Sequence, residues 1–150
     1  MTTYRIGELF CGPGGIAKGV ELAAERVRVD GVVVDAIHAW ANDYDRDTCN
    51  TYQANFPEAK VIHKDIRKLD IETDLTEIDG LAFGFPCNDF SVVGEQKGIE
   101  GTFGPLYEYG ARVIDRYSPT WFVAENVGGL RNSNDGRAFE MILDRLQHAG

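Results

Sequence analysis

The stretch GFPCNDFS, residues 84–91, places Cys87 directly after Pro86, at the end of a short apolar run. A lone cysteine beside an apolar strand is most often a small side chain that only packs. Cys87 differs because it opens a glycine-rich segment, where backbone N–H groups or a nearby cation can stabilise a thiolate. We therefore expect Cys87 to act as a nucleophile and Cys11 and Cys49 to be buried.

A carboxylate ends a second apolar run. In TWFVAENV, residues 120–127, Glu125 follows five mostly apolar residues and precedes Asn126. We expect Glu125 to be partly buried, and a buried carboxyl group can serve as an acid; the alternative is a cap or a surface residue. His38, His63 and His148 occupy no comparable place, which disfavours a hydrolytic Cys–His pair.

Alternating elements must position these residues. The patterns predict strands over residues 4–10, 32–41, 60–66, 80–85 and 120–127, and helices over 15–27, 45–56, 105–117 and 137–146. Residues 86–104 are expected to form a loop. This alternation predicts an α/β fold with an open, doubly wound, mostly parallel sheet, whose ligands lie at the carboxyl ends of the strands.

Two of the predicted helices show an apolar face. In the first, Ile16, Val20, Ala23 or Ala24, and Val27 recur at helical spacing; in the last, Phe139, Ile142, Leu143 and Leu146 do.

Glycines separate the first strand from the first helix. Gly12, Gly14 and Gly15 allow a sharp turn and a close approach of backbone to a ligand. The dinucleotide spacing GxGxxG fails at Ala17, so a pyrophosphate cradle is not favoured. A plain strand-to-helix turn is the alternative.

Carboxylates follow the next two strands. Asp43 is placed to hold ribose hydroxyls, with Tyr44 beside it as a flat surface for an adenine. Asp45 is a rival for that role and also a candidate helix cap. Asp65 is placed to accept from an adenine amino group. Together they describe a nucleoside site without a phosphate clamp, as S-adenosylmethionine requires.

Composition narrows the class of protein. The chain has 150 residues, no apolar run long enough to cross a membrane and no basic-then-apolar N-terminus, so we expect a cytoplasmic protein without a signal peptide. Its three cysteines form no CxxC pair, which argues against a disulfide framework or a metal site. The net charge of −9 disfavours nucleic acid by itself.

The motifs ELFCGPGG, ANDYDRDTCNTYQANF, KDI, GFPCNDFS, GEQKG and AENV occur in the order and rough spacing of DNA (cytosine-5) methyltransferases, which this chain resembles over nearly its whole length. The resemblance implies the N-terminal part of a Rossmann-like catalytic domain. It implies that Cys87 adds to C6 of a cytosine flipped out of double-stranded DNA, while Glu125 engages N3 and the amino group. The methyl donor would be S-adenosyl-L-methionine, leaving S-adenosyl-L-homocysteine.

By motif match, the catalytic residues are Pro86, Cys87, Glu125 and Asn126. The residues expected to line the cofactor site are Phe10, Gly12, Gly14, Gly15, Asp43, Tyr44, Asp65, Ile66, Phe85 and Leu106. Three positions depart from the family pattern: Asp43 stands for the more frequent Glu, Asn88 for Gln, and Phe103 for an Arg. The first two changes are mild, whereas the third puts closure of the loop in doubt.

The chain lacks a Gln-x-Arg-x-Arg motif and an identifiable target-recognition domain. We expect residues 1–150 to need a C-terminal half or a second subunit that carries both, together with the basic DNA-binding surface. A restriction–modification or phage system is the expected setting, with the enzyme on the nucleoid when bound to DNA. The alternatives are the tRNA-methylating branch of the family, a non-catalytic subunit that binds S-adenosylmethionine, and a nicotinamide-dependent oxidoreductase.

Overall fold

The computed structural model describes residues 2–29, 33–86 and 106–150. These fall into two compact units, which we describe separately. The first unit comprises Met1–Phe83 with Pro119–Val123, and the second comprises Gly84–Ser118 with Ala124–Gly150. Cys87, Asn88, Phe103 and all of the predicted loop except Pro86 lie outside the described residues.

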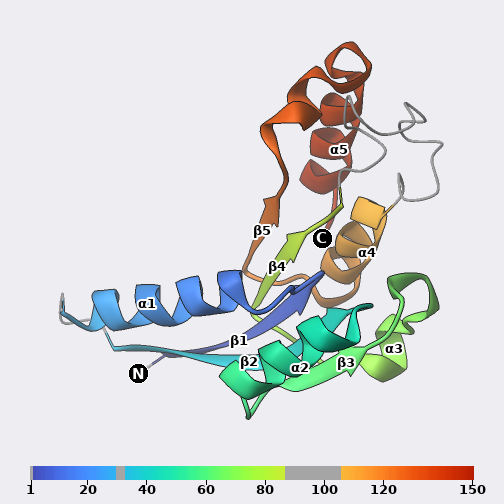
Figure 1. The fold of residues 1–150 in the computed structure, drawn as a ribbon. Coiled ribbons are helices and arrows are strands. Elements are labelled where there is room, and N and C mark those ends of the chain that lie inside the picture. Colours follow the sequence, from blue (N-terminus) through green and yellow to red (C-terminus); the bar gives the residue numbers. More distant parts are fainter. Residues whose placement is uncertain (1, 30–32, 87–105) are drawn as a thin grey trace. The chain divides into compact units, whose positions relative to one another are not determined.

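Every predicted strand and helix is present, with shifts at the ends (Figure 1). The strands are β1 (Thr2–Leu9), β2 (Val34–Asp43), β3 (Lys60–His63), β4 (Gly80–Gly84) and β5 (Trp121–Glu125). The longer helices are α1 (Gly15–Val29), α2 (Arg46–Asn55), α4 (Tyr107–Tyr117) and α5 (Arg137–Gln147). The sequence patterns missed the short helices η1 (Ile66–Lys68), α3 (Ile71–Asp74) and η4 (Gly128–Gly136), because elements of three to nine residues carry too little periodicity to detect.

The strands form one sheet in the order β3-β2-β1-β4-β5. β1 pairs in parallel with both β2 and β4, and β2 pairs in parallel with β3. The predicted α/β class with a parallel sheet is therefore confirmed. The order reverses direction between β1 and β4, and in open parallel sheets ligands bind at the carboxyl ends of the strands at such a point.

The core of the first unit packs α1 and α2 on one face of the sheet. A buried cluster joins these helices to the sheet. It contains Ala17 of α1, Tyr52 of α2, Phe56 at the C-cap of α2 and Ala41 of β2. On the predicted face of α1, Ile16 and Val20 are partly buried, whereas Val27 near the end of the helix is 37% exposed. His38 lies within β2, where burial lowers the pKa of its ring, and the ring packs 4.7 Å from that of Phe56.

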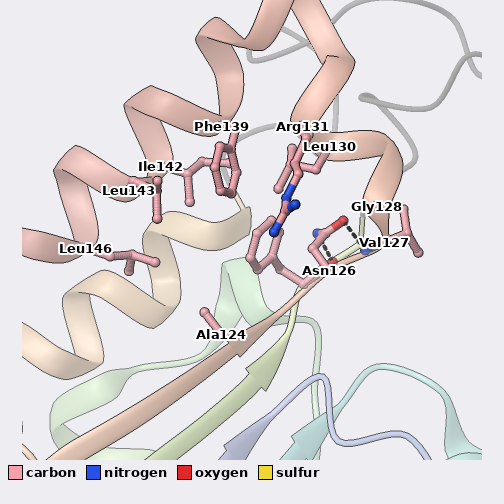
Figure 2. Close-up of a pocket in the computed structure, with 11 residues that line it drawn as sticks. Ala124, Asn126, Val127, Gly128, Leu130, Arg131, Phe139, Ile142, Leu143 and Leu146 are labelled. Atoms are coloured by element: carbon pink, nitrogen blue, oxygen red, sulfur yellow. Dashed lines mark hydrogen bonds between the residues drawn. The ribbon is translucent and has the colours of Figure 1, made fainter.

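The second unit is held by ion pairs between its two long helices. Arg145 of α5 contacts Glu108 at 3.0 Å and Asp115 at 2.6 Å, both on α4. The predicted apolar residues of α5, Phe139, Ile142, Leu143 and Leu146, line one groove of about 390 Å³, which confirms that they share a face (Figure 2). Leu143 remains 41% exposed because that groove is open. No helix in the described residues is long and apolar enough to cross a membrane.

Gly7 gives a test of the packing in the first unit. A Cβ atom on Gly7 of β1 would lie 2.3 Å from the ring of Trp40, which is fully buried on β2. We expect Gly7→Ala to lower the free energy of unfolding by about 1–3 kcal/mol, the usual cost of overpacking a core. The same change at Gly19 of α1, where a Cβ meets nothing within 4 Å, should raise it by up to about 1 kcal/mol. Urea denaturation of the two variants measures both effects, and equal stabilities would contradict the packing.

Candidate functional site

The turn after β1 is the most constrained part of the described backbone. Phe10, Gly12 and Gly14 have φ of 54°, 55° and 98°. A left-handed conformation costs phenylalanine about 1–3 kcal/mol, and such residues cluster at functional sites. The turn is held from β2, since the Cys11 N–H donates to the Asn42 carbonyl at 3.0 Å.

The glycines of this turn lie in different surroundings, crowded at Gly14 and open at Gly12 and Gly15. A Cβ atom on Gly14 would lie 2.4 Å from the ring of Phe56 and 3.2 Å from that of Tyr52, so the turn rests directly on α2. A Cβ on Gly12 or Gly15 would meet nothing within 4 Å. The backbone at Gly12 and Gly15 therefore borders open space, where a ligand can approach closely.

Asp43 joins this turn to the end of β2. Its Oδ2 accepts from the Gly12 N–H at 3.0 Å, and its Oδ1 accepts from the Asp45 N–H at 3.0 Å. Tyr44, the next residue, is 74% exposed. Asp45 is the N-cap of α2 and accepts from the Thr48 N–H at 2.8 Å, which confirms the cap reading of that residue. The geometry thus places Asp43 and Tyr44 beside the glycine turn.

Asp65 lies at the end of the β3 segment and is already paired. It caps η1, and its Oδ2 lies 2.6 Å from Nη2 of Arg67. Hydrogen bonds from Arg67 hold the pKa of Asp65 at about 2. Ile66, beside it, is buried. Arg67 was not predicted as a partner of Asp65, although its position two residues after Asp65 was the available signal.

Cys11 and Cys49 are both buried, as predicted. Burial, followed by the charge of Asp43, raises the pKa of each thiol. Both therefore stay protonated and pack as small apolar side chains. Within the described residues, no group of three His, Cys, Asp or Glu side chains is arranged to hold a metal ion.

In the second unit, Asn126 ties the exit of β4 to the exit of β5. Its Nδ2 donates to the Phe85 carbonyl at 2.8 Å, and its Oδ1 accepts from the Val127 N–H at 2.8 Å. Phe85 is buried and Pro86 follows it, partly exposed. Asn126 therefore fixes the backbone two residues before Cys87.

Glu125 is more exposed than its sequence context predicts. The expected partial burial is wrong: Glu125 is exposed, as are Phe122, Val123 and Ala124 before it. The reason is that, among the residues that the structure describes, β5 is the edge strand of the sheet, so no described strand pairs with one side of the apolar run before Glu125. Its Oε2 lies 3.1 Å from where a Cβ on Gly84 would be, so glycine leaves room for the carboxylate.

The groove of the second unit begins at this same strand exit. It runs from Phe85 and Asn126 to the apolar face of α5, with the Arg131 guanidinium 5.9 Å from the ring centre of Phe139 (Figure 2). Leu106, the residue before α4, is buried. The predicted site residues are thus divided: the turn, Asp43, Tyr44, Asp65 and Ile66 belong to the first unit, and Phe85, Pro86, Leu106, Glu125 and Asn126 belong to the second.

A parallel sheet with a glycine turn and a carboxylate at its strand ends defines a Rossmann-like fold of the nucleoside-binding kind. Comparison with protein families is more specific. The family model for C-5 cytosine-specific DNA methylase matches residues 4–150, and the chain belongs to that family.

Curated relatives agree with this assignment. The Type II methyltransferase M.BbvI of Brevibacillus brevis is 49% identical over 98% of this chain and 41% of its own length. The Type II methyltransferase M.Bsp6I of a Bacillus strain is 37% identical over 97% of this chain and 43% of its own length. The chain therefore spans about two-fifths of these relatives.

Solved structures confirm the fold. A putative DNA modification methyltransferase encoded within an E. coli prophage superposes with a TM-score of 0.64 and 24% identity, over 95% of this chain and 37% of that one. The S. pombe Dnmt2 methyltransferase gives 0.64 and 20%, over 95% and 40% of the two chains.

The Asn126 contacts predict a measurable effect on stability. Asn126→Ala should lower the free energy of unfolding by about 1–2 kcal/mol, because the buried Phe85 carbonyl loses its donor. Asn126→Asp should cost more, because a carboxylate oxygen would face that carbonyl oxygen. The control Asn50→Ala, at an exposed position of α2, should change stability by less than about 0.5 kcal/mol. Thermal unfolding measures all three, and wild-type stability of Asn126→Asp would show that the contact does not form.

Proposed function

We propose that this chain is the N-terminal part of the catalytic domain of a DNA (cytosine-5) methyltransferase of a Type II restriction–modification system. The observation that carries the proposal is the family match over residues 4–150, with Cys87 after Pro86 and Glu125 at the end of β5. The relatives' names, Type II methyltransferases, support the setting.

S-adenosylmethionine fits the residues of the first unit. It carries a nucleoside and no phosphate, and the turn offers open backbone at Gly12 and Gly15, the Asp43 carboxylate and the exposed ring of Tyr44. Ala17 stands where a dinucleotide site has its third glycine, and its methyl group is buried in the α1–α2 cluster. Lys18, which follows Ala17 in the sequence, is paired with Glu21 at 2.8 Å. A cationic cofactor suits such an acidic surrounding better than a pyrophosphate does.

In the proposed site, Asp43 would hold the ribose hydroxyls, Tyr44 would lie against the adenine and Asp65 would receive its amino group. Phe10 and Ile66 would supply apolar walls. Asp43 also holds the Gly12 N–H at 3.0 Å, so the residue that binds the ribose would shape the turn as well.

The chemistry follows from Cys87 and Glu125. The thiolate of Cys87 adds to C6 of the flipped cytosine, and the electron pair moves toward C5. The Glu125 carboxyl group binds N3 and the amino group and stabilises the charge that develops on the ring. S-adenosylmethionine, when bound, supplies an electrophilic methyl group for C5. C5 then loses its proton to water, and the Cys87–C6 bond breaks as the ring double bond returns.

Double-stranded DNA is the proposed substrate, and it calls for a further part of the enzyme. Phosphate binding needs Lys and Arg, whereas this chain has 24 acidic against 15 basic residues. The edge strand β5 exposes Phe122 and Val123, at 37% and 48%. Exposed apolar edge strands invite pairing with another segment. We propose that a C-terminal part or second subunit covers this edge and carries the target-recognition domain.

Covalent trapping tests the nucleophile. Duplex DNA containing 5-fluorocytosine should become covalently bound to the enzyme, because fluorine at C5 blocks the last elimination. Cys87→Ala should abolish trapping and methyl transfer, whereas Cys11→Ala, at a buried thiol, should keep both. Gel electrophoresis under denaturing conditions measures the adduct. Trapping that persists in Cys87→Ala would end the assignment of Cys87.

The requirement for a further part is tested by complementation. We expect residues 1–150 alone to bind duplex DNA weakly and without sequence preference, and not to methylate it. Joining them to the remaining sequence of M.BbvI, here called the complemented chain, should restore both properties. The measurement is incorporation of tritiated methyl groups into duplex DNA. Site-specific activity from residues 1–150 alone would contradict the prediction.

A further inference from the structure

A carboxyl group without an assigned role lies in the core of the first unit. Glu8 is on β1, the central strand of that unit, and is only 2% exposed. It lies in register with Ala41 of β2 and Ala82 of β4. Glutamate is rarely buried to this degree unless a partner compensates for its desolvation.

The partner of Glu8 is on α2. The Tyr52 hydroxyl donates to Oε2 of Glu8 at 3.1 Å, and Tyr52 is itself fully buried. Burial raises the pKa of Glu8 to about 7, which the hydrogen bond from Tyr52 partly opposes. Burial, followed by the charge of Glu8, also raises the pKa of Tyr52. Tyr52 therefore remains a hydrogen-bond donor while Glu8 ionises.

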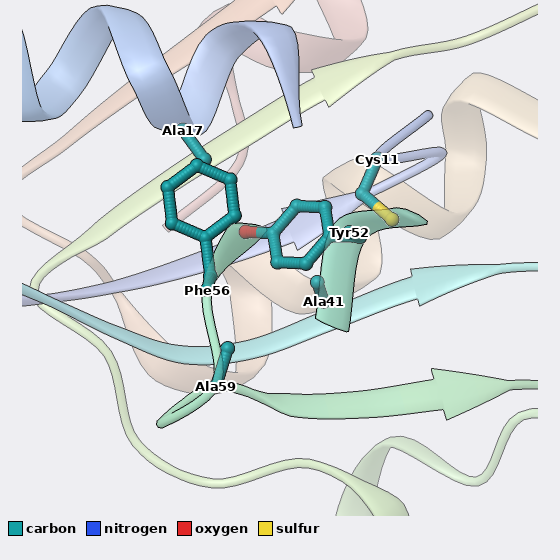
Figure 3. Close-up of a cluster of buried hydrophobic side chains, with 6 residues drawn as sticks. All are labelled: Cys11, Ala17, Ala41, Tyr52, Phe56 and Ala59. Atoms are coloured by element: carbon teal, nitrogen blue, oxygen red, sulfur yellow. The ribbon is translucent and has the colours of Figure 1, made fainter. Parts of the chain in front are cut away.

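Tyr52 in turn supports the glycine turn. Its ring, with that of Phe56, lies against Gly14, where a Cβ atom would be 3.2 Å from Tyr52 and 2.4 Å from Phe56. Between them in the chain, Asn55 donates from Nδ2 to the Pro13 carbonyl at 3.2 Å. Figure 3 shows Tyr52 and Phe56 side by side in this cluster, with Cys11 at its edge. The C-terminal end of α2 therefore supports the turn.

We propose that Glu8 is a positioning residue for the cofactor: its hydrogen bond to Tyr52 fixes the C-terminal end of α2, which supports the turn of Gly12 to Gly15. The proposal builds on the proposed function, in which this turn receives S-adenosylmethionine. Ionised Glu8 accepts a stronger hydrogen bond than neutral Glu8, and its charge favours a cationic ligand. The turn should therefore receive the cofactor best when Glu8 is ionised.

Other titratable groups surround Glu8 without neutralising it. Cys11 of the turn interacts with both Glu8 and Tyr52, and Glu21 of α1 interacts with Tyr52. Asp43 at the end of β2 and Cys49 of α2 act on Cys11. All are acids, and both thiols stay protonated. β4 contributes Ala82 in register and no charge.

If Glu8 positions the cofactor, stability and cofactor affinity depend on pH in opposite directions. Because the folded-state pKa of Glu8 is raised from 4.5 to about 7, its contribution to stability is fully present below 4.5 and is lost as the pH rises through about 7. Cofactor affinity should change in the opposite direction and increase over that range. A purely structural role would make affinity follow stability.

Calorimetric titration with S-adenosylmethionine tests this, on the chain alone and on the complemented chain. We expect wild-type affinity to increase about three- to tenfold from about pH 6 to about pH 8, the effect of one hydrogen bond. Glu8→Gln, which still accepts a hydrogen bond but cannot ionise, should abolish this increase. Over the same pH range, the unfolding free energy of wild type should fall relative to that of Glu8→Gln.

A second variant and a control separate positioning from general destabilisation. Tyr52→Phe should weaken binding about three- to tenfold at about pH 8. Trp40→Phe removes a buried donor to the Thr76 carbonyl, 2.9 Å away, and should lower stability while leaving the pH profile of binding unchanged.

Identical pH profiles for wild type and Glu8→Gln, or equal losses of affinity in Trp40→Phe and Tyr52→Phe, would overturn the role of Glu8 and leave the proposed function standing. If wild type does not bind S-adenosylmethionine in either form, the proposed function fails and the role of Glu8 fails with it.

Discussion

The close approach of α2 to the turn after β1 is the contact on which the first unit depends. It requires a residue without a Cβ atom at position 14, where the rings of Phe56 and Tyr52 occupy the space. Asp43 and Tyr44, just before the start of α2, lie beside the same turn because β2 pairs with β1 and Asp43 accepts from the Gly12 N–H. Helix packing on one side and strand pairing on the other therefore fix the backbone and the carboxylate that a nucleoside ligand would meet.

In the second unit, the residues that follow β4 and β5 are held together. Asn126 uses both ends of its amide for this, donating to the Phe85 carbonyl and accepting from the Val127 N–H. In the proposed mechanism the nucleophile follows the first exit and the carboxylate ends the second strand. An amide suits this position because it can donate and accept at once, which neither aspartate nor leucine can.

The fold was largely predictable because its signals are local. Apolar runs and helical spacing located every strand and long helix, and the glycines marked the turn. The Asp45 cap and the burial of Cys11 and Cys49 also followed from sequence position. Glu125 was not predictable in the same way, since its exposure depends on β5 being the edge of the sheet, which is a property of strand order and not of the apolar run before it. Glu8 was missed because a single carboxylate within a strand gives no sign that Tyr52, 44 residues later, will bind it.

The central claim is that the turn after β1 and the ends of β2 and β3 form one site for S-adenosylmethionine. The most direct measurement is a nuclear magnetic resonance titration of the ¹⁵N-labelled chain with S-adenosylhomocysteine. We expect the backbone amide signals of Gly12, Tyr44 and Ile66 to shift together with one dissociation constant, while those of Thr3 and Arg5, at the opposite end of β1, do not shift. Saturable shifts confined to other residues, with Gly12 and Tyr44 unchanged, would contradict it.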